Sequence, residues 1–128
     1  MSRRPYLRKV ERNWWLQHPR YVAYMIRELT SLFVGLYCVL LAVGLVRLAQ
    51  GHPAWDGFVA NLSSPLGISL QSICLVFAIY HSVTWFSLTP KAMPLMVKGE
   101  PVPGIVIVGA HYVAWAAVSA VVLIGAGM

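Results

Sequence analysis

Charged residues are scarce in this sequence, and acidic residues are the scarcest of all. Only 11% of the 128 residues are charged, with four Asp and Glu against ten Lys and Arg. A soluble domain usually has about 25% charged residues, so this chain has too little polarity to cover a water-soluble globule. The mean hydropathy of +0.68 agrees with this. The composition therefore predicts one small all-α membrane domain over residues 1–128, with no room for a second.

Cysteine is also nearly absent. Cys38 and Cys74 each fall inside an apolar segment, and the sequence has no CxxC pair and no Cys/His spacing of the kind that binds metals. Nothing in it therefore predicts a structural zinc site or an iron–sulfur cluster. We expect both cysteines to behave as small buried hydrophobic residues.

Three long apolar segments fill most of the chain. The first, Leu29 to Val46, has no ionisable side chain other than Tyr37 and Cys38. With its flanks, a helix of this length spans about 30 Å, the thickness of the hydrocarbon core of a bilayer. The sequence therefore predicts three transmembrane helices, at about residues 24–47, 65–88 and 105–127.

The connections between these segments contain turn-forming residues. We expect a loop over about Leu48 to Ser64, in which Gly51-His52-Pro53 is a turn signal, and we expect Trp55 and Phe58 to lie at the outer membrane interface. The histidine of this loop has no second ligand and is expected to be merely solvated. Thr89-Pro90-Lys91 is expected to end the second helix, and further prolines and glycines to keep the second loop irregular.

The basic residues are distributed unevenly along the chain. Only Arg47 borders the first loop, whereas the other nine lie before the first apolar segment or in the second loop: Arg3, Arg4, Arg8, Lys9, Arg12, Arg20, Arg27, Lys91 and Lys98. Short loops rich in Lys and Arg stay in the cytoplasm. This predicts a cytoplasmic N-terminus with a basic arm over residues 1–12, and a periplasmic C-terminus. It also favours a membrane over nucleic acid as the reason for the basic charge.

Two adjacent opposite charges, Arg27 and Glu28, lie at the threshold of the first span. Ionisable groups at this depth are costly and indicate a functional site, although an arginine that reaches the headgroups and a glutamate at a helix start are the alternative. In the second span His81 lies ten residues before Lys91, about 15 Å from the membrane boundary. Trp85 follows it by four residues on the same helix face, so these residues can cluster near one membrane surface.

The chemistry of this cluster suits a quinone. Arg27 and Trp85 can donate hydrogen bonds to its oxygens, Glu28 can act as a base with access to water, and His81 can relay or tune the proton. Leu88 would form part of an apolar wall. His111, in the third span, could pair with His81 to ligate a b-type haem, but a hydrogen bond to a neighbouring carbonyl is the favoured interpretation.

A family resemblance supports this interpretation. Over about residues 5–100 the order and spacing of four motifs resemble the C subunit of bacterial quinol:fumarate reductases. The motifs are Pro5-Tyr6, Trp14-Trp15, Met25-x-Arg27-Glu28-x-Thr30 and His81-x-x-x-Trp85-Phe86-x-Leu88-x-Pro90-Lys91.

The resemblance implies a membrane-anchor protein that is not catalytic by itself and belongs to a larger helical bundle. It would pair with a second membrane anchor, the D subunit, and hold the flavoprotein (A) and iron–sulfur (B) subunits at the bacterial inner membrane, where menaquinol oxidation supports fumarate reduction in anaerobic respiration. Flavin and Fe–S clusters would then lie in the partner subunits, and no haem is expected. The positions implied to bind quinone are Arg27, Glu28, His81, Trp85 and Leu88, with Ser31 as a weaker contact.

Two alternatives stay open at this point. One is the anchor of the related succinate dehydrogenase, with a haem b held by His81 or His111. The other is a non-redox membrane protein, either a small transporter or an assembly factor. A transporter usually has internal repeats, and none is visible among the three spans.

Overall fold

The computed structural model describes residues 9–127 of the chain. Its elements in chain order are the 3-10 helix η1 (Trp14–Leu16), helices α1 (Pro19–Ala49), α2 (His52–Leu62) and α3 (Pro65–Ala92), strands β1 (Met96–Val97) and β2 (Glu100–Pro101), and helix α4 (Gly104–Gly125). The first eight residues of the predicted basic arm, including the Pro5-Tyr6 motif, lie outside the described residues.

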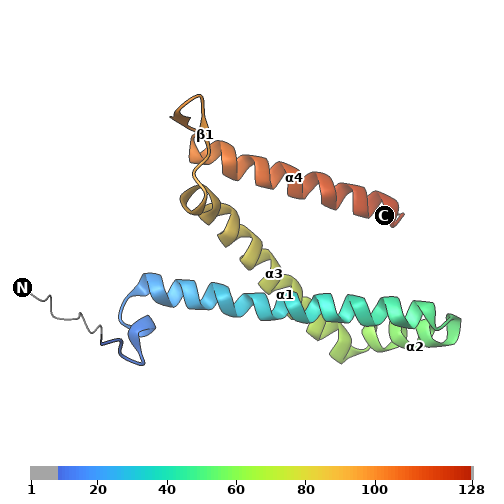
Figure 1. Ribbon diagram of the computed structural model, residues 1–128. Helices are drawn as coiled ribbons and strands as arrows, with labels where there is room; N and C mark the ends of the chain where they lie inside the picture. Colours follow the sequence, from blue (N-terminus) through green and yellow to red (C-terminus); the bar gives the residue numbers. More distant parts are fainter. Residues whose placement is uncertain (1–8, 128) are drawn as a thin grey trace, which may run out of the picture.

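Three of these helices are long and apolar enough to cross a membrane. α1, α3 and α4 have 31, 28 and 22 residues. At 1.5 Å per residue these lengths are about 46, 42 and 33 Å, each more than the ~30 Å hydrocarbon core of a bilayer. The helices alternate in direction, so that η1 and the β1–β2 hairpin lie at one end, here called the hairpin end (Figure 1). α2 and the last turn of α4 lie at the other end, here called the α2 end. The prediction of an all-α membrane protein with three transmembrane helices is confirmed.

Local sequence signals fix where the first two spans begin. Pro19 starts α1 after His18, whose Nδ1 accepts a hydrogen bond of 3.1 Å from the backbone N–H of Arg20. Pro65 starts α3 after Ser64, whose Oγ accepts a hydrogen bond of 3.1 Å from the N–H of Gly67. Proline is favoured at the first helical position because its missing N–H would have no intrahelical partner there, and a polar side chain just before it satisfies one of the free N–H groups.

The connection between the first two spans is not the loop predicted over residues 48–64. It contains α2, on which the half-buried apolar residues Trp55, Phe58 and Leu62 recur at helical spacings of three and four. Gly51 has φ of +98° and supplies the turn before α2, while Pro53 lies in the first helical turn, where proline is tolerated. The residues that indicated a loop therefore mark a helix start.

The second connection also differs from the prediction. α3 continues past Thr89-Pro90-Lys91 to Ala92, because a proline in the last turn removes only one helical hydrogen bond. The segment predicted to be irregular contains the antiparallel β1–β2 hairpin, whose turn is made by Lys98 and Gly99 with φ of +52° and +86°. α4 ends at Gly125, slightly before the predicted boundary at residue 127.

α3 is the central helix of the fold. It contacts α1 on one side and α4 on the other, and within residues 9–127 α4 makes no contact with α1. Few side chains are buried, and Thr30, Cys74 and Ile107 are 1%, 2% and 6% exposed. Cys38 is exposed, so the prediction of a buried residue is wrong for this cysteine, because no helix among residues 9–127 covers its side of α1. The exposed apolar surface is what lipid or further subunits would cover.

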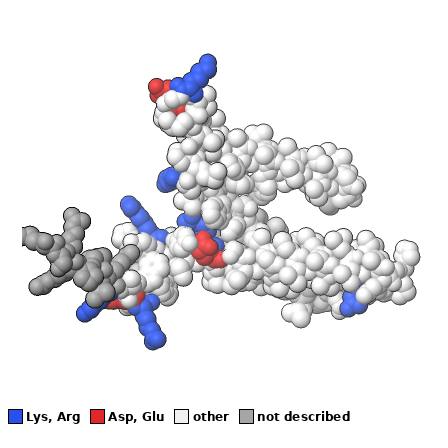
Figure 2. All heavy atoms as spheres, viewed as in Figure 1, with Lys and Arg blue, Asp and Glu red and all other residues white. Residues whose placement is uncertain are grey.

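The charged side chains lie mainly at the hairpin end. Figure 2 shows Lys, Arg, Asp and Glu gathered around the start of α1 and around the hairpin, while the helix shafts are almost uncharged on the visible face. At the α2 end, Arg47 is the basic residue in the last turn of α1, and its Nη1 donates to Oε1 of Gln50. The two ends of the molecule therefore differ in charge as well as in architecture.

Candidate functional site

The most deeply buried side chain in the described part of the chain is polar. Thr30 on α1 is 1% exposed, and its Oγ1 lies 2.9 Å from Nδ1 of His81 on α3. The same oxygen lies 2.5 Å from the backbone carbonyl oxygen of Arg27, one turn earlier in α1. Leaving a buried polar group without a partner costs about 1–3 kcal/mol. These contacts therefore favour one register of α1 against α3 at this level.

Arg27 and Trp85 lie beside this hydrogen-bonded pair. Cζ of Arg27 is 6.0 Å from the centre of the Trp85 ring, within the range of a cation–π interaction. The rings of His81 and Trp85 are 6.1 Å apart between centroids. Trp85 is 39% exposed, so part of its indole stays open. We call Arg27, Thr30, His81 and Trp85 the Thr30 cluster; it lies toward the hairpin end of the α1–α3 contact.

One atom of this cluster has an unused hydrogen-bonding capacity. Nε of Arg27 is buried and has no hydrogen-bond partner within residues 9–127. A guanidinium N–H is a donor only, and removing it from water without an acceptor is unfavourable. Most buried polar groups in folded proteins have a partner, so the guanidinium of Arg27 keeps hydrogen-bonding capacity that no group within residues 9–127 uses.

The other three predicted site residues are placed less closely. Glu28 is half-buried on α1 directly after Arg27, at the same level of the helix. Ser31 is exposed, and its Oγ donates to the backbone carbonyl of Glu28, within its own helix. Leu88 is half-buried on α3, one turn after Trp85 and on the same side of the helix. The structure thus brings Arg27, His81 and Trp85 into one cluster, with Glu28 and Leu88 at its edges.

His111 belongs to a separate group of aromatic side chains between α3 and α4. Its Nδ1 lies 2.7 Å from the carbonyl oxygen of Ile107, the hydrogen bond within its own helix that the sequence favoured. Its ring centroid is 5.3 Å from that of Phe86, which also contacts Tyr112 and Trp115 edge-on at 5.1 and 6.1 Å. His81 instead pairs with α1, so the two imidazoles have different neighbours.

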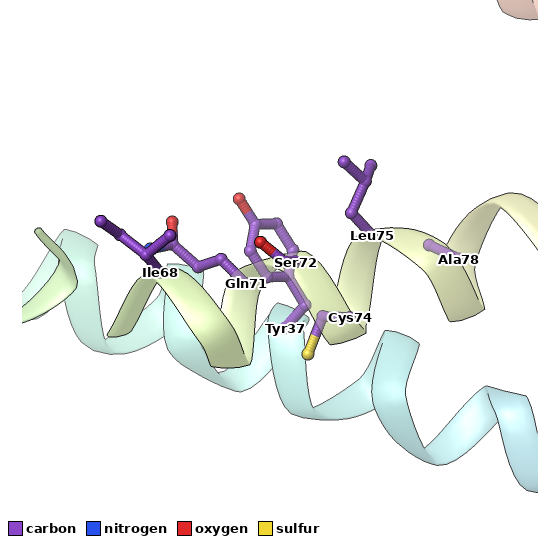
Figure 3. Close-up of a pocket in the computed structure, with 7 residues that line it drawn as sticks. All are labelled: Tyr37, Ile68, Gln71, Ser72, Cys74, Leu75 and Ala78. Carbon is purple, nitrogen blue, oxygen red and sulfur yellow. The ribbon is translucent and has the colours of Figure 1, made fainter. Parts of the chain in front are cut away.

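A hollow between α1 and α3 does not coincide with the Thr30 cluster. It has a volume of about 410 Å³ and is lined by Tyr37 of α1 and six residues of α3: Ile68, Gln71, Ser72, Cys74, Leu75 and Ala78. In Figure 3 the sulfur of Cys74 points toward α1, while Leu75 points away from it. Cys74 lies seven residues before His81, about 10 Å along α3 and toward the α2 end.

Thr30 was absent from the predicted set of site residues, although it forms part of the resemblance motif. A threonine near the start of an apolar helix is commonly satisfied by a carbonyl of its own helix, and that bond to Arg27 is indeed present. The contact with His81 depends on the register between α1 and α3. Its only sequence signal is that Thr30 follows Arg27 by three residues and so shares its helix face.

Comparisons with known proteins agree on one family. The family described as the C subunit of fumarate reductase matches residues 1–126. The chain is 39% identical over 123 residues to the fumarate reductase C subunit of Vibrio parahaemolyticus, a match that covers 96% of this chain and 97% of that protein. The corresponding proteins of Vibrio vulnificus and Photobacterium profundum are 40% and 37% identical, with the same coverage of both chains.

Proposed function

Because this chain belongs to the family of fumarate reductase C subunits, we propose that it binds quinol at the Thr30 cluster and supports fumarate reduction as a non-catalytic membrane anchor. The single observation that carries the quinol site is the unpaired guanidinium of Arg27, whose Nε–H has no acceptor within residues 9–127. It lies in a cluster with an indole and an imidazole at one end of two apolar spans. A quinone headgroup is a flat apolar ring with oxygen acceptors at its edges, which fits this set of groups.

The anchoring role is supported by the surface of the spans. Large apolar side chains are exposed along α1, α3 and α4, as expected for helices covered by lipid and by further subunits. On α4 the small residues Ala110, Ala114, Ala116 and Ala120 are exposed at four-residue spacings, which allow another helix to approach closely in lipid. This surface suits the neighbouring D subunit of the anchor. The flavoprotein (A) and iron–sulfur (B) subunits would then bind at the cytoplasmic side.

The orientation follows from charge. Six of the seven described basic residues lie toward the hairpin end, and only Arg47 lies at the α2 end. By the positive-inside rule the hairpin end faces the cytoplasm, and the C-terminus faces the periplasm of a bacterial inner membrane. The Thr30 cluster then lies near the cytoplasmic surface, where electrons can pass to the extrinsic subunits and protons to water.

Each residue has a proposed role in quinol oxidation, which releases two protons and two electrons. Arg27 donates a hydrogen bond to a headgroup oxygen, and Trp85 and Leu88 line the apolar faces of the ring. Glu28, half-buried at the membrane threshold, carries protons between the site and water. The electrons leave to the redox groups of the partner subunits, and menaquinol is the quinol implied by the family. No haem takes part, so the purified complex is expected to lack a Soret band.

Replacing Arg27 tests this proposal directly. Arg27→Leu removes the guanidinium with its unpaired donor and puts an apolar side chain in its place. Hydrogen bonds to charged groups contribute about 1.5–3 kcal/mol, so quinol-driven fumarate reduction in membranes should fall roughly 10- to 150-fold. Fumarate reduction driven by an artificial dye, which bypasses the quinol site, should be retained. Glu28→Gln should give the same split.

Arg47→Leu is the matched control, because it removes the same side chain from the other end of α1. It should leave the ratio of quinol-driven to dye-driven activity unchanged. Retention of quinol-driven activity in both Arg27→Leu and Glu28→Gln would contradict the proposed site. Loss of both activities would instead report failed assembly of that variant. In that case the ratio of quinol-driven to dye-driven activity is measured in Arg27→Lys, which keeps the positive charge.

A further inference from the structure

The hydrogen bonds of Thr30 determine which nitrogen of His81 carries the proton. A threonine hydroxyl has one hydrogen to donate and lone pairs to accept. The Thr30 oxygen lies 2.5 Å from the carbonyl oxygen of Arg27, which can only accept. Two oxygens this close repel each other unless a hydrogen lies between them, so the single hydroxyl hydrogen is used in this bond.

The contact with His81 must then run in the opposite direction. Oγ1 of Thr30 has no hydrogen left, so it accepts from Nδ1–H of His81 at 2.9 Å. A neutral imidazole that is protonated at Nδ1 has a bare lone pair at Nε2. No hydrogen bond to this Nε2 occurs among the described residues. His81 therefore offers an acceptor, whereas Arg27 in the same cluster offers a donor.

We propose that Thr30 is a positioning residue that holds His81 in the Nδ1–H tautomer. Nε2 of His81 then accepts a hydrogen bond from a quinol hydroxyl. As a result the site binds the reduced form of its ligand more tightly than the oxidised form. This rests on the proposed quinol site. The hydroxyl of a quinol can donate to Nε2 of His81 and accept from the guanidinium of Arg27 at the same time. The carbonyl of the oxidised quinone can only accept, so it would leave the lone pair of His81 unsatisfied.

The size of the preference for quinol over quinone follows from the cost of leaving Nε2 of His81 without a donor. A buried acceptor left without a donor costs about as much as a lost hydrogen bond, which corresponds to roughly tenfold in affinity. When Thr30 cannot accept, the imidazole is free to take the other tautomer, in which Nε2–H is a donor. The site would then accommodate the quinone carbonyl at the expense of the quinol.

The test uses membranes that contain the complete complex, with a water-soluble naphthoquinol as donor and fumarate as acceptor. Two constants are measured: the KM for the naphthoquinol, and the inhibition constant of the corresponding naphthoquinone as product inhibitor. Thr30→Val keeps the shape of the side chain and removes the hydroxyl. It should raise the KM about tenfold while the inhibition constant stays unchanged or falls. Thr30→Ser, which keeps the hydroxyl, should restore both wild-type values.

Thr84→Val is the matched control on α3. Thr84 is half-buried, and within the described residues its hydroxyl contacts only the carbonyl oxygens of Tyr80 and His81 in its own helix. Neither constant should change in this variant. The inference is overturned if Thr30→Val moves both constants by the same factor, or if Thr30→Ser behaves like Thr30→Val, since either result indicates a packing role. Retention of quinol oxidation in Arg27→Leu and Glu28→Gln would instead remove the proposed quinol site itself.

Discussion

The two ends of the α1–α3 pair are held together in different ways. At the α2 end the chain is continuous through α2, and the contacts are close. A side chain at Gly67 would overlap the carbonyl oxygens of Asn61 and Leu62, and one at Gly44 would meet the ring of Phe58. Nε2 of Gln71 donates to the carbonyl oxygen of Leu62 at 3.0 Å, which satisfies the last turn of α2.

At the hairpin end nothing covalent joins α1 to α3 directly. Their contact there depends on the hydrogen bond between Thr30 and His81 and on the position of Arg27 over Trp85. Arg27 keeps an unpaired buried donor, and Trp85 keeps part of its indole exposed. Between the two ends, Phe33 and Phe77 stack at 4.1 Å between ring centroids.

This difference between the two ends predicts that one end mainly determines stability and the other mainly determines quinol binding. The α2 end uses its hydrogen-bonding capacity internally, so substitutions there should change how well the protein folds and assembles. The hairpin end has unused hydrogen-bonding capacity, so substitutions there should change the quinol KM and the quinol-driven activity of the complex. Three substitutions test this division, from the largest expected effect to the smallest.

Gly67→Ala should have the largest effect, and the effect should be on stability. The added methyl group would collide with backbone atoms of the α2–α3 turn, which cannot move without breaking the α2 end. Overpacking of this kind costs about 1–3 kcal/mol. We expect a lower thermal midpoint of the detergent-solubilised complex, with normal quinol KM in the complex that assembles.

Gly35→Ala is the control for this substitution, because a methyl group at Gly35 would have nothing within 4 Å. It should leave the midpoint unchanged or raise it, since alanine favours a helix more than glycine does. A changed quinol KM in Gly67→Ala, or an equal loss of stability in both variants, would argue against the division.

Trp85→Leu should have an intermediate effect, and the effect should be on quinol handling. The indole contacts the guanidinium of Arg27 and offers an open aromatic surface. Its loss should raise the quinol KM about tenfold, the equivalent of 1.4 kcal/mol. Trp115→Leu removes an indole of similar exposure from α4 and should leave the KM unchanged. Equal KM values in the two variants would place the indole of Trp85 outside the site.

Gly44→Ala should have the smallest effect. The new methyl group would lie 2.9 Å from Cε1 of Phe58, but this is a side-chain ring that can shift. We expect a loss of stability below about 1 kcal/mol, and Phe58→Leu in the same chain should recover part of it, as a double-mutant cycle would measure. Purely additive effects would show that Gly44 and Phe58 do not depend on each other.

The spans could be predicted from sequence because each is a long apolar segment with proline or charge at its boundaries. α2 could not, since Gly51 and Pro53 indicate a loop as readily as a helix start, and its apolar spacing is short. The predicted site residues Arg27, His81 and Trp85 do come together. Thr30 and His81 are 51 residues apart in the chain. Their contact was missed because it depends on the register between two helices, which no local pattern encodes.

The central claim is that a quinol headgroup binds at the Thr30 cluster. The most direct measurement is a cryo-electron microscopy structure of the assembled complex with a bound quinol analogue. The account predicts one headgroup oxygen within about 3 Å of both Nε2 of His81 and a guanidinium nitrogen of Arg27. A headgroup bound elsewhere, with a side chain of a partner protein as the acceptor for Arg27, would contradict it.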